Sequence, residues 1–103
     1  MVLPKDATHV TFVVWILAQA DRLDPVGDIG RDFRSSVEDF TREEWGSAYP
    51  HVPYPPDLVA KGKLETYKQW VDHVSAFNHD AAGAIGAAWV EFRRYKVEHH
   101  EFA

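Results

Sequence analysis

The sequence predicts an all-α fold, a compact bundle of four or five helices with a proline-rich connection in the middle. Apolar residues recur at spacings of three and four in separate stretches, which is the period of amphipathic helices. Capping residues and prolines stand at the boundaries of those stretches. The 103 residues are 46% hydrophobic and 26% charged, which suits one domain over 1–103, with a polar end at 97–103 that frays.

The first predicted helix runs from about Thr8 to Arg22. One face carries mostly apolar residues at helical spacing, with one glutamine among them: Phe12, Trp15, Ile16, Gln19, Ala20 and Leu23. A secretory signal is the alternative, because Val10–Leu17 resembles its apolar region and 18–20 resembles a cleavage site. The residues before this run include both Lys5 and Asp6, so they lack a clear positive charge. We therefore interpret the segment as a central core helix and expect a cytoplasmic protein.

The second predicted helix begins at Pro25, with Asp24 as its N-cap, and ends near Ser36. Its inner face is expected to hold Val26, Ile29, Phe33 and Val37. Gly27 and Gly30 each lower helix stability, and a close approach of the first helix would explain both. Asp28 and Asp32, near Arg31 and Arg22, are interpreted as ion pairs and as charges that complement the helix dipole.

The middle of the chain combines an acidic stretch with prolines. Thr41 and Glu44 have the spacing of a capping box, so residues 36–45 are expected to hold a short helix or a turn. Gly46–Pro56 contains Pro50, Pro53, Pro55 and Pro56 and is expected to be an extended, stiff connection.

Two further helices are predicted in the second half. The third spans Asp57 or Lys61 to Phe77, with an inner face of Leu64, Tyr67, Val71 and Val74, flanked by Trp70 and Phe77. The last runs from about Asp80 to Lys96, with Ile85, Ala88, Trp89, Phe92 and Tyr95 inward. Its first half is rich in alanine and glycine, so a neighbouring helix can approach closely.

Two parts of the chain carry recognisable patterns. Residues 12–32 contain aromatic positions Phe12 and Trp15, then Gln19-x-x-Arg22-x-Asp24-Pro25-x-Gly27-Asp28. Residues 79–92 end in Ala88-Trp89-Val90-Glu91-Phe92. Both parts resemble the YozE SAM-like family of small bacterial helical domains. The resemblance implies a fold similar to sterile alpha motifs and a role in protein association or nucleic-acid binding. It supplies no catalytic residues or cofactor, and residues 46–63 depart from it as an apparent insertion.

No residue pattern indicates an enzyme, a cofactor or a metal site. The chain has no cysteine, which excludes disulfide scaffolds, thiol catalysis and cysteine-based metal sites. The six histidines lack the i, i+4 spacing of zinc ligands and are interpreted as solvated. The paired carboxylates are explained by stability, and neither a phosphate-binding loop nor a nucleophile motif is present.

The function predicted from the residues is therefore binding to another protein, as a non-enzymatic interaction module. The candidate surface combines the acidic stretch with the proline–aromatic strip: Glu38, Asp39, Glu43, Glu44, Tyr49, His51 and Tyr54. An acidic surface selects a basic partner, and a regulator or inhibitor from a mobile element is one form of this function. The strip has a structural alternative, in which it only covers a core edge.

The alternative function is nucleic-acid binding through a basic face of the last two helices: Lys61, Lys63, Lys68, Arg93, Arg94 and Lys96. The net charge of −5 argues against a generic basic nucleic-acid binder.

Overall fold

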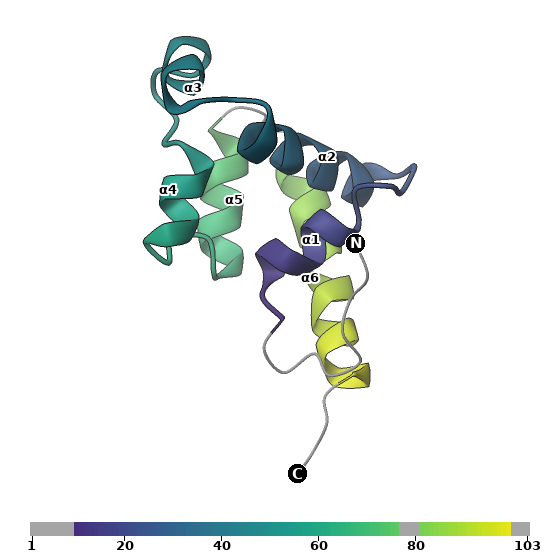
Figure 1. Cartoon of the computed structure of the whole chain (residues 1–103). Helices are drawn as coiled ribbons and strands as arrows, with labels where there is room; N and C mark the ends of the chain where they lie inside the picture. The colour runs from purple at the N-terminus through teal and green to yellow at the C-terminus, as the bar shows by residue number, and fades with distance from the viewer. Residues whose placement is uncertain (1–9, 77–80, 100–103) are drawn as a thin grey trace.

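The computed structural model describes residues 10–76 and 81–99, and in this part of the chain every regular element is a helix (Figure 1). This confirms the all-α prediction, with one more helix than expected. The helices are α1 (Phe12–Ala18), α2 (Pro25–Glu38), α3 (Arg42–Ala48), α4 (Pro55–Ala60), α5 (Tyr67–Ser75) and α6 (Ala81–Glu98).

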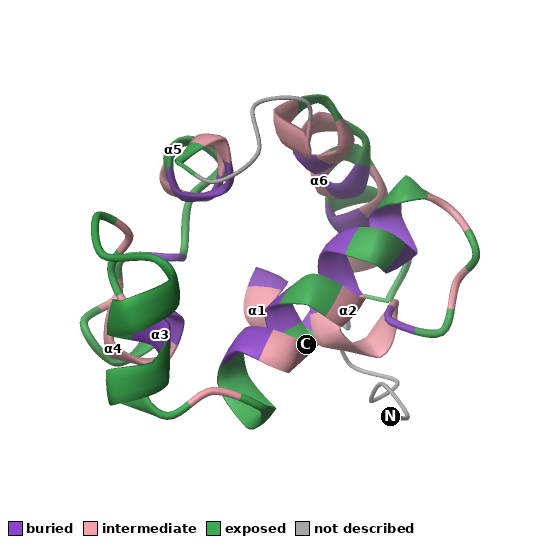
Figure 2. Cartoon of the chain, turned by 90° about the horizontal axis from the view of Figure 1, so that it is seen from above, coloured by how far each residue is buried: buried purple, intermediate pink, exposed green. Residues whose placement is uncertain are grey.

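The core lies between α1, α2, α5 and α6, and their buried residues face one another (Figure 2). Phe12 stands at its centre, because its ring centroid lies 4.5–5.8 Å from those of Trp15, Trp70, Trp89 and Phe92. Aromatic pairs at these separations stabilise a core beyond their buried area. The apolar segment near the start of the sequence is therefore a core helix in this fold.

The helix α1 is shorter than predicted. It starts at Phe12, because the Thr11 side chain caps it, and its last turn tightens into three-residue hydrogen bonds from Gln19 and Ala20. The helical spacing ends there, so the prediction that Leu23 faces the core is wrong, and Leu23 is 99% exposed. The spacing of apolar residues in the sequence therefore predicts burial only for residues that lie within the helix itself.

The two glycines of α2 allow the close approach that the sequence predicts. A Cβ on Gly30 would stand 2.5 Å from the Ile16 carbonyl oxygen, and one on Gly27 would overlap the Arg22 carbonyl. Arg31, predicted to form an ion pair, pairs with Asp28 and donates to the carbonyl oxygens of Ala20 and Arg22, at 2.9 and 2.6 Å. The turn from α1 to α2 is thus packed directly against α2.

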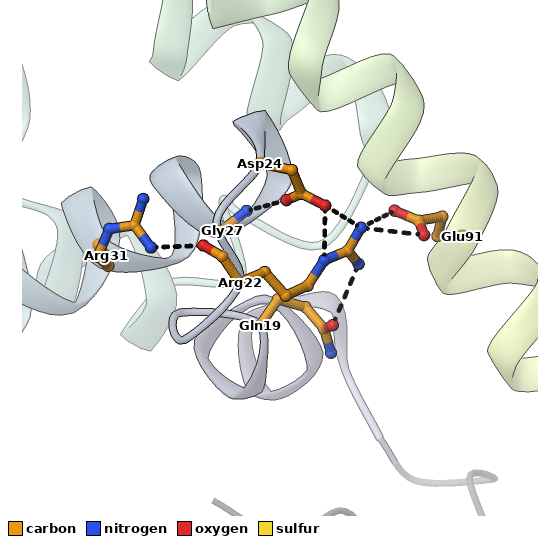
Figure 3. A network of polar contacts seen from close by, with 6 residues as sticks. All are labelled: Gln19, Arg22, Asp24, Gly27, Arg31 and Glu91. Carbon is orange, nitrogen blue, oxygen red and sulfur yellow. Dashed lines mark hydrogen bonds and ion pairs between the residues drawn. The ribbon is translucent and has the colours of Figure 1, made fainter.

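Arg22 joins the α1–α2 turn, in which it lies, to the N-cap of α2 and to α6, far along the sequence (Figure 3). Its guanidinium lies 2.6 Å from Asp24 and 3.1 Å from Glu91 of α6, and it also donates to Gln19. Asp24 in turn accepts from the Gly27 backbone N–H at 2.9 Å and caps α2. These hydrogen bonds hold the pKa of Asp24 below its usual value, and the N-cap contact is the largest cause.

The end of α2 differs from the prediction, whereas the start of α3 has the capping box that the sequence predicts. The helix α2 extends two residues beyond the predicted end and stops at Glu38. Val37 lies in this last turn and is 38% exposed, so its predicted place on the inner face is wrong. The capping box of Thr41 and Glu44 is present and starts α3.

The proline-rich segment differs from the prediction at both ends. α3 continues to Ala48, and Pro55 and Pro56 occupy the first turn of α4. Proline fits there because the backbone N–H groups in the first turn of a helix have no acceptor within the helix, so the N–H that proline lacks is not missed. The irregular connection is therefore residues 49–54 and not Gly46–Pro56.

The predicted third helix is two helices. The chain turns after α4 at Gly62, whose φ of 68° favours glycine, and a second capping box of Thr66 and Gln69 starts α5. Leu64 lies in the connection and is still buried, whereas Tyr67 is 45% exposed and does not take its predicted inner position. Phe77 lies outside the described residues.

The last helix, α6, extends to Glu98, so the predicted tail at 97–103 begins two residues too early. Ile85, Ala88 and Phe92 are buried as predicted, while Trp89 and Tyr95 are half-buried. Lys96 donates from Nζ to the Val10 carbonyl oxygen at 3.1 Å. This contact fixes the backbone before α1 against α6.

Candidate functional site

The predicted partner-binding residues gather on a small lobe at one end of the molecule, formed by residues 38–60 with α3 and α4 (Figure 1). The lobe has its own aromatic cluster, separate from the main core. Trp45 is 4% exposed, and its ring centroid lies 4.5 Å from that of Tyr49, 5.5 Å from Phe40 and 6.3 Å from Tyr54. The four rings fix the shape of the lobe.

Hydrogen bonds and an ion pair also hold the lobe together. The Trp45 indole N–H donates to the Val52 carbonyl at 2.9 Å, and the Tyr54 hydroxyl donates to the Phe40 carbonyl at 2.7 Å. Arg42 pairs with Asp57 and also stands 5.7 Å over the Tyr54 ring. These contacts tie residues 49–54 to both flanking helices, so the connection is held in one conformation.

The acidic residues line the junction between α2 and α3, and all four are exposed. Two of them have local structural roles. Asp39 accepts from the Ser35 hydroxyl at 2.9 Å, and Glu44 accepts from the Thr41 backbone N–H. Glu38 and Glu43 have no such bond among the described residues, so they are the better candidates for contact with a partner.

Some residues of the proline–aromatic strip are available for partner binding, and others only cover the core of the lobe. Tyr54 is half-buried and bonded to Phe40, so it covers the lobe's own cluster. Tyr49 is 38% exposed although its ring lies against Trp45, and His51 is exposed in the turn. Tyr49 and His51 therefore face solvent, and Tyr54 is a structural residue.

The structure also contains a cavity that the sequence does not predict. It has a volume of about 220 Å³ and lies where the lobe meets the body, between α2, α3, α5 and the start of α6. Rings from both parts of the molecule line it, namely Phe33, Phe40, Trp45, Tyr49 and Trp70. No spacing in the sequence indicates it, because its walls come from segments far apart in the chain.

Two residues that line this cavity have shifted pKa values, and they differ in exposure. Asp32 is exposed, and partial desolvation, with a contribution from Asp28, raises its pKa. His73 is 8% exposed, and burial lowers its pKa from 6.5 to about 4. The prediction that the histidines are solvated is therefore wrong for His73, which follows Trp70 by three residues on the inner face of α5.

The two shifts bear on what the cavity can do chemically. A general base works best with a pKa near the working pH, and an imidazole of pKa about 4 accepts protons poorly at neutral pH. A carboxylate whose pKa is raised by burial gains instead from an approaching cation. His73 is thus poorly suited to act as a general base at neutral pH.

The six basic residues of the alternative surface lie at two places. Lys61 and Lys63 are exposed in the α4–α5 connection, and Lys68 is exposed in the first turn of α5. Tyr67 and Trp89 have ring centroids 6.0 Å apart, which places the start of α5 beside the middle of α6. Arg93 and Arg94 are exposed and lie one helical turn after Trp89 on α6. Lys96 instead contacts the Val10 carbonyl.

Among residues 10–76 and 81–99, no three potential metal ligands gather in one place, and no helix has the length and apolar character needed to cross a membrane. His9, His79 and His100 lie outside these ranges. No protein-family model or curated protein matches the chain, and no solved structure matches its fold. Function must therefore be argued from the site itself.

Proposed function

We propose that the protein is a non-enzymatic helical module that binds a basic protein partner through the lobe at residues 38–60. The observation that carries this proposal is the placement of the acidic residues and of Tyr49 and His51 on one lobe, held by its own aromatic cluster. Such a surface would also serve a regulator or inhibitor.

Rigidity and charge both support the proposal. A surface that is already held in its bound shape loses little conformational entropy on association. Residues 38–54 carry four carboxylates and one arginine, and that arginine is paired with Asp57. The net negative charge favours encounter with a positive surface.

The test is capture of a partner from the native cell with the wild-type chain and with the double variant Glu38→Lys/Glu43→Lys. Both positions are exposed and neither belongs to a capping box, so the double variant keeps the side-chain caps of the lobe. We expect the double variant to bind the captured partner at least tenfold more weakly. Glu98→Lys, at the end of α6, is the matched control and should bind as the wild type does.

Salt gives a second readout of the same proposal. Attraction between exposed charges is screened over about 8 Å at physiological ionic strength. Association with the captured partner should therefore slow as salt is added, and the slowing should be smaller in the double variant. Equal binding by all three chains, at every salt concentration, would show that the lobe is not the interface.

Nucleic-acid binding is the second candidate, and the exposure of Lys61, Lys63 and Lys68 around one connection supports it. Its test is titration with duplex DNA at two salt concentrations. Binding that weakens steeply with salt, and that is lost in Lys63→Glu/Lys68→Glu, would favour this candidate. Failure to bind at low salt would remove it.

We also propose kinship with the YozE SAM-like family. The residues that carry the resemblance have connected structural roles: Gln19, Arg22, Asp24 and Glu91 form one polar network, and Gly27 gives room for the Arg22 backbone. These residues stabilise the body and lie outside the lobe. The kinship therefore supports a shared fold and leaves the partner to be decided by residues 38–60.

A further inference from the structure

We infer that the cavity between the lobe and the body receives one aromatic side chain of the partner, followed by a lysine or arginine that pairs with Asp32. This inference rests on the proposed function and deepens it, because it states the chemistry of the partner segment. Three observations carry it: the size of the cavity, the rings that line it, and the position of the carboxylate.

The size separates two kinds of occupant. Pockets for small-molecule ligands and cofactors have volumes of about 300–1,000 Å³. The cavity measures about 220 Å³, which is below that range and is large enough for one side chain. Single aromatic side chains seated in such pockets dominate many protein interfaces. The volume therefore favours an anchor residue over a free ligand.

The lining favours an aromatic anchor. Phe33 and Trp70 come from the body, and Phe40 and Trp45 come from the lobe. Rings that meet edge to face or offset gain more than their buried area alone provides. An aliphatic side chain would fill the same space without this gain.

Asp32 adds the charge selection. It is the one carboxylate among the described lining residues, and within residues 10–76 and 81–99 no cation lies at ion-pair distance from it, although the charge of Arg31 acts on it from further away. The nearest arginine in sequence, Arg31, is paired with Asp28 and bonded to backbone carbonyls of the α1–α2 turn. Asp32 is therefore able to accept a cation from outside.

His73 does not oppose this cation. Its imidazole lies in the cavity wall, and burial keeps it neutral at physiological pH. The hydroxyl of Ser36 donates to the Phe33 carbonyl, and that of Ser35 donates to Asp39. The wall therefore presents to the anchor mainly aromatic rings, among them the neutral imidazole of His73, and one carboxylate.

The test uses small probes and needs no partner. Tryptamine carries an indole and an ammonium group, and indole-3-acetate carries the same ring with a carboxylate. We expect tryptamine to bind with millimolar affinity, as a single side-chain mimic does, and to shift the amide resonances of Phe33 and Val74 and the Trp45 indole resonance. Indole-3-acetate should bind at least fivefold more weakly.

Variants locate the site. Asp32→Asn should weaken tryptamine binding at least fivefold, and Asp21→Asn, an exposed carboxyl in the α1–α2 turn, is its control. Ser35→Leu should fill the cavity and abolish the shifts. Ser47→Leu makes the same change on the exposed side of α3 and should leave them intact.

Three results would overturn the inference. These are equal affinity for the two probes, tryptamine shifts that persist in Ser35→Leu, or no shifts with the probe at about 10 mM, well within the range of a single anchor. Each of them leaves the lobe proposal standing, because that proposal is tested by Glu38 and Glu43 with the captured partner. If the lobe proposal failed and tryptamine still bound, the cavity would remain a site for an aromatic cation, but its occupant would not come from a partner of the lobe.

Discussion

The body and the lobe are each built around one buried tryptophan, and the two tryptophans have different kinds of neighbours. The rings next to Trp70 include Phe12, Phe33 and His73, from three different helices. The rings next to Trp45 are Phe40, Tyr49 and Tyr54, all within nine residues of it in the sequence. The body is therefore held by long-range contacts, and the lobe largely by local ones. Locally held units open with lower free energy than the whole fold, so the lobe can unfold while the body stays intact.

The largest expected effect is the loss of unfolding free energy on replacing Trp70, and it should exceed the loss on replacing Trp45. Trp70 is fully buried, so Trp70→Ala should lower the free energy of unfolding by about 3–5 kcal/mol. A domain is stable by only about 5–15 kcal/mol in total, so much of the fold's stability is lost. Urea unfolding followed by circular dichroism measures the change.

The matched substitution is Trp45→Ala in the lobe. The global free energy of unfolding should fall by no more than about 1–2 kcal/mol, because the loss is limited by the lobe's own stability. Amide exchange should quicken over residues 41–54 and stay slow in α1, α5 and α6. Equal global losses in the two variants would show that body and lobe unfold as one unit.

The second prediction concerns the junction, where His73 stands. Its pKa is about 4 in the folded chain and near 6.5 when unfolded, so the unfolded chain binds the proton first as the pH falls. Stability is therefore complete above pH 6.5 and decreases between pH 6.5 and 4, by about 3 kcal/mol in all. Unfolding free energies measured at a series of pH values test this.

His73→Leu is the control for that pH dependence and should flatten the curve over the same interval. The lowered pKa values of Asp24 and Asp57 act elsewhere, because their contributions are lost only as the pH falls below their usual value of 3.8. The raised pKa of Asp32 has the opposite sign and is present in both chains. A curve for His73→Leu as steep as that of the wild type would contradict the assignment to this residue.

The smallest expected effects come from the ion pairs of the two regions. Glu91→Gln removes the link from α6 to Arg22, a partly exposed pair, and should cost below about 1 kcal/mol. Asp57→Asn removes the partner of Arg42 in the lobe, and because Arg42 is more exposed than Arg22 this change should cost less than Glu91→Gln. Thermal unfolding of both variants compares them, and a larger loss for Asp57→Asn would reverse the ranking of the two regions.

The parts of the fold that the sequence predicts are those decided by neighbouring residues. The N-cap at Asp24, the proline that follows it and the capping box of Thr41 act within four residues, so their spacing is sufficient. The two glycines of α2 are an informative exception. Their cost in a helix indicated a close contact, and the Ile16 and Arg22 carbonyls are that contact.

The parts that the sequence does not predict depend on the residue at which a helix ends and on the elements that pack against it. Leu23 keeps helical spacing with α1 and lies beyond its end, so the pattern placed it in the core wrongly. His73 has the composition of a surface residue, and its burial follows only from the position of Trp70 on α5. The acidic lobe residues were found from composition, whereas the cavity beside them requires α2, α3 and α5 to be placed together.

The network from Arg22 to Glu91 spans 69 residues of sequence, and α6 packs along α1, α2 and α5. A chain emerging from the ribosome therefore exposes Phe12 and Trp15 until α6 is available to pack on them. The body is thus a unit that assembles only after translation has passed α6.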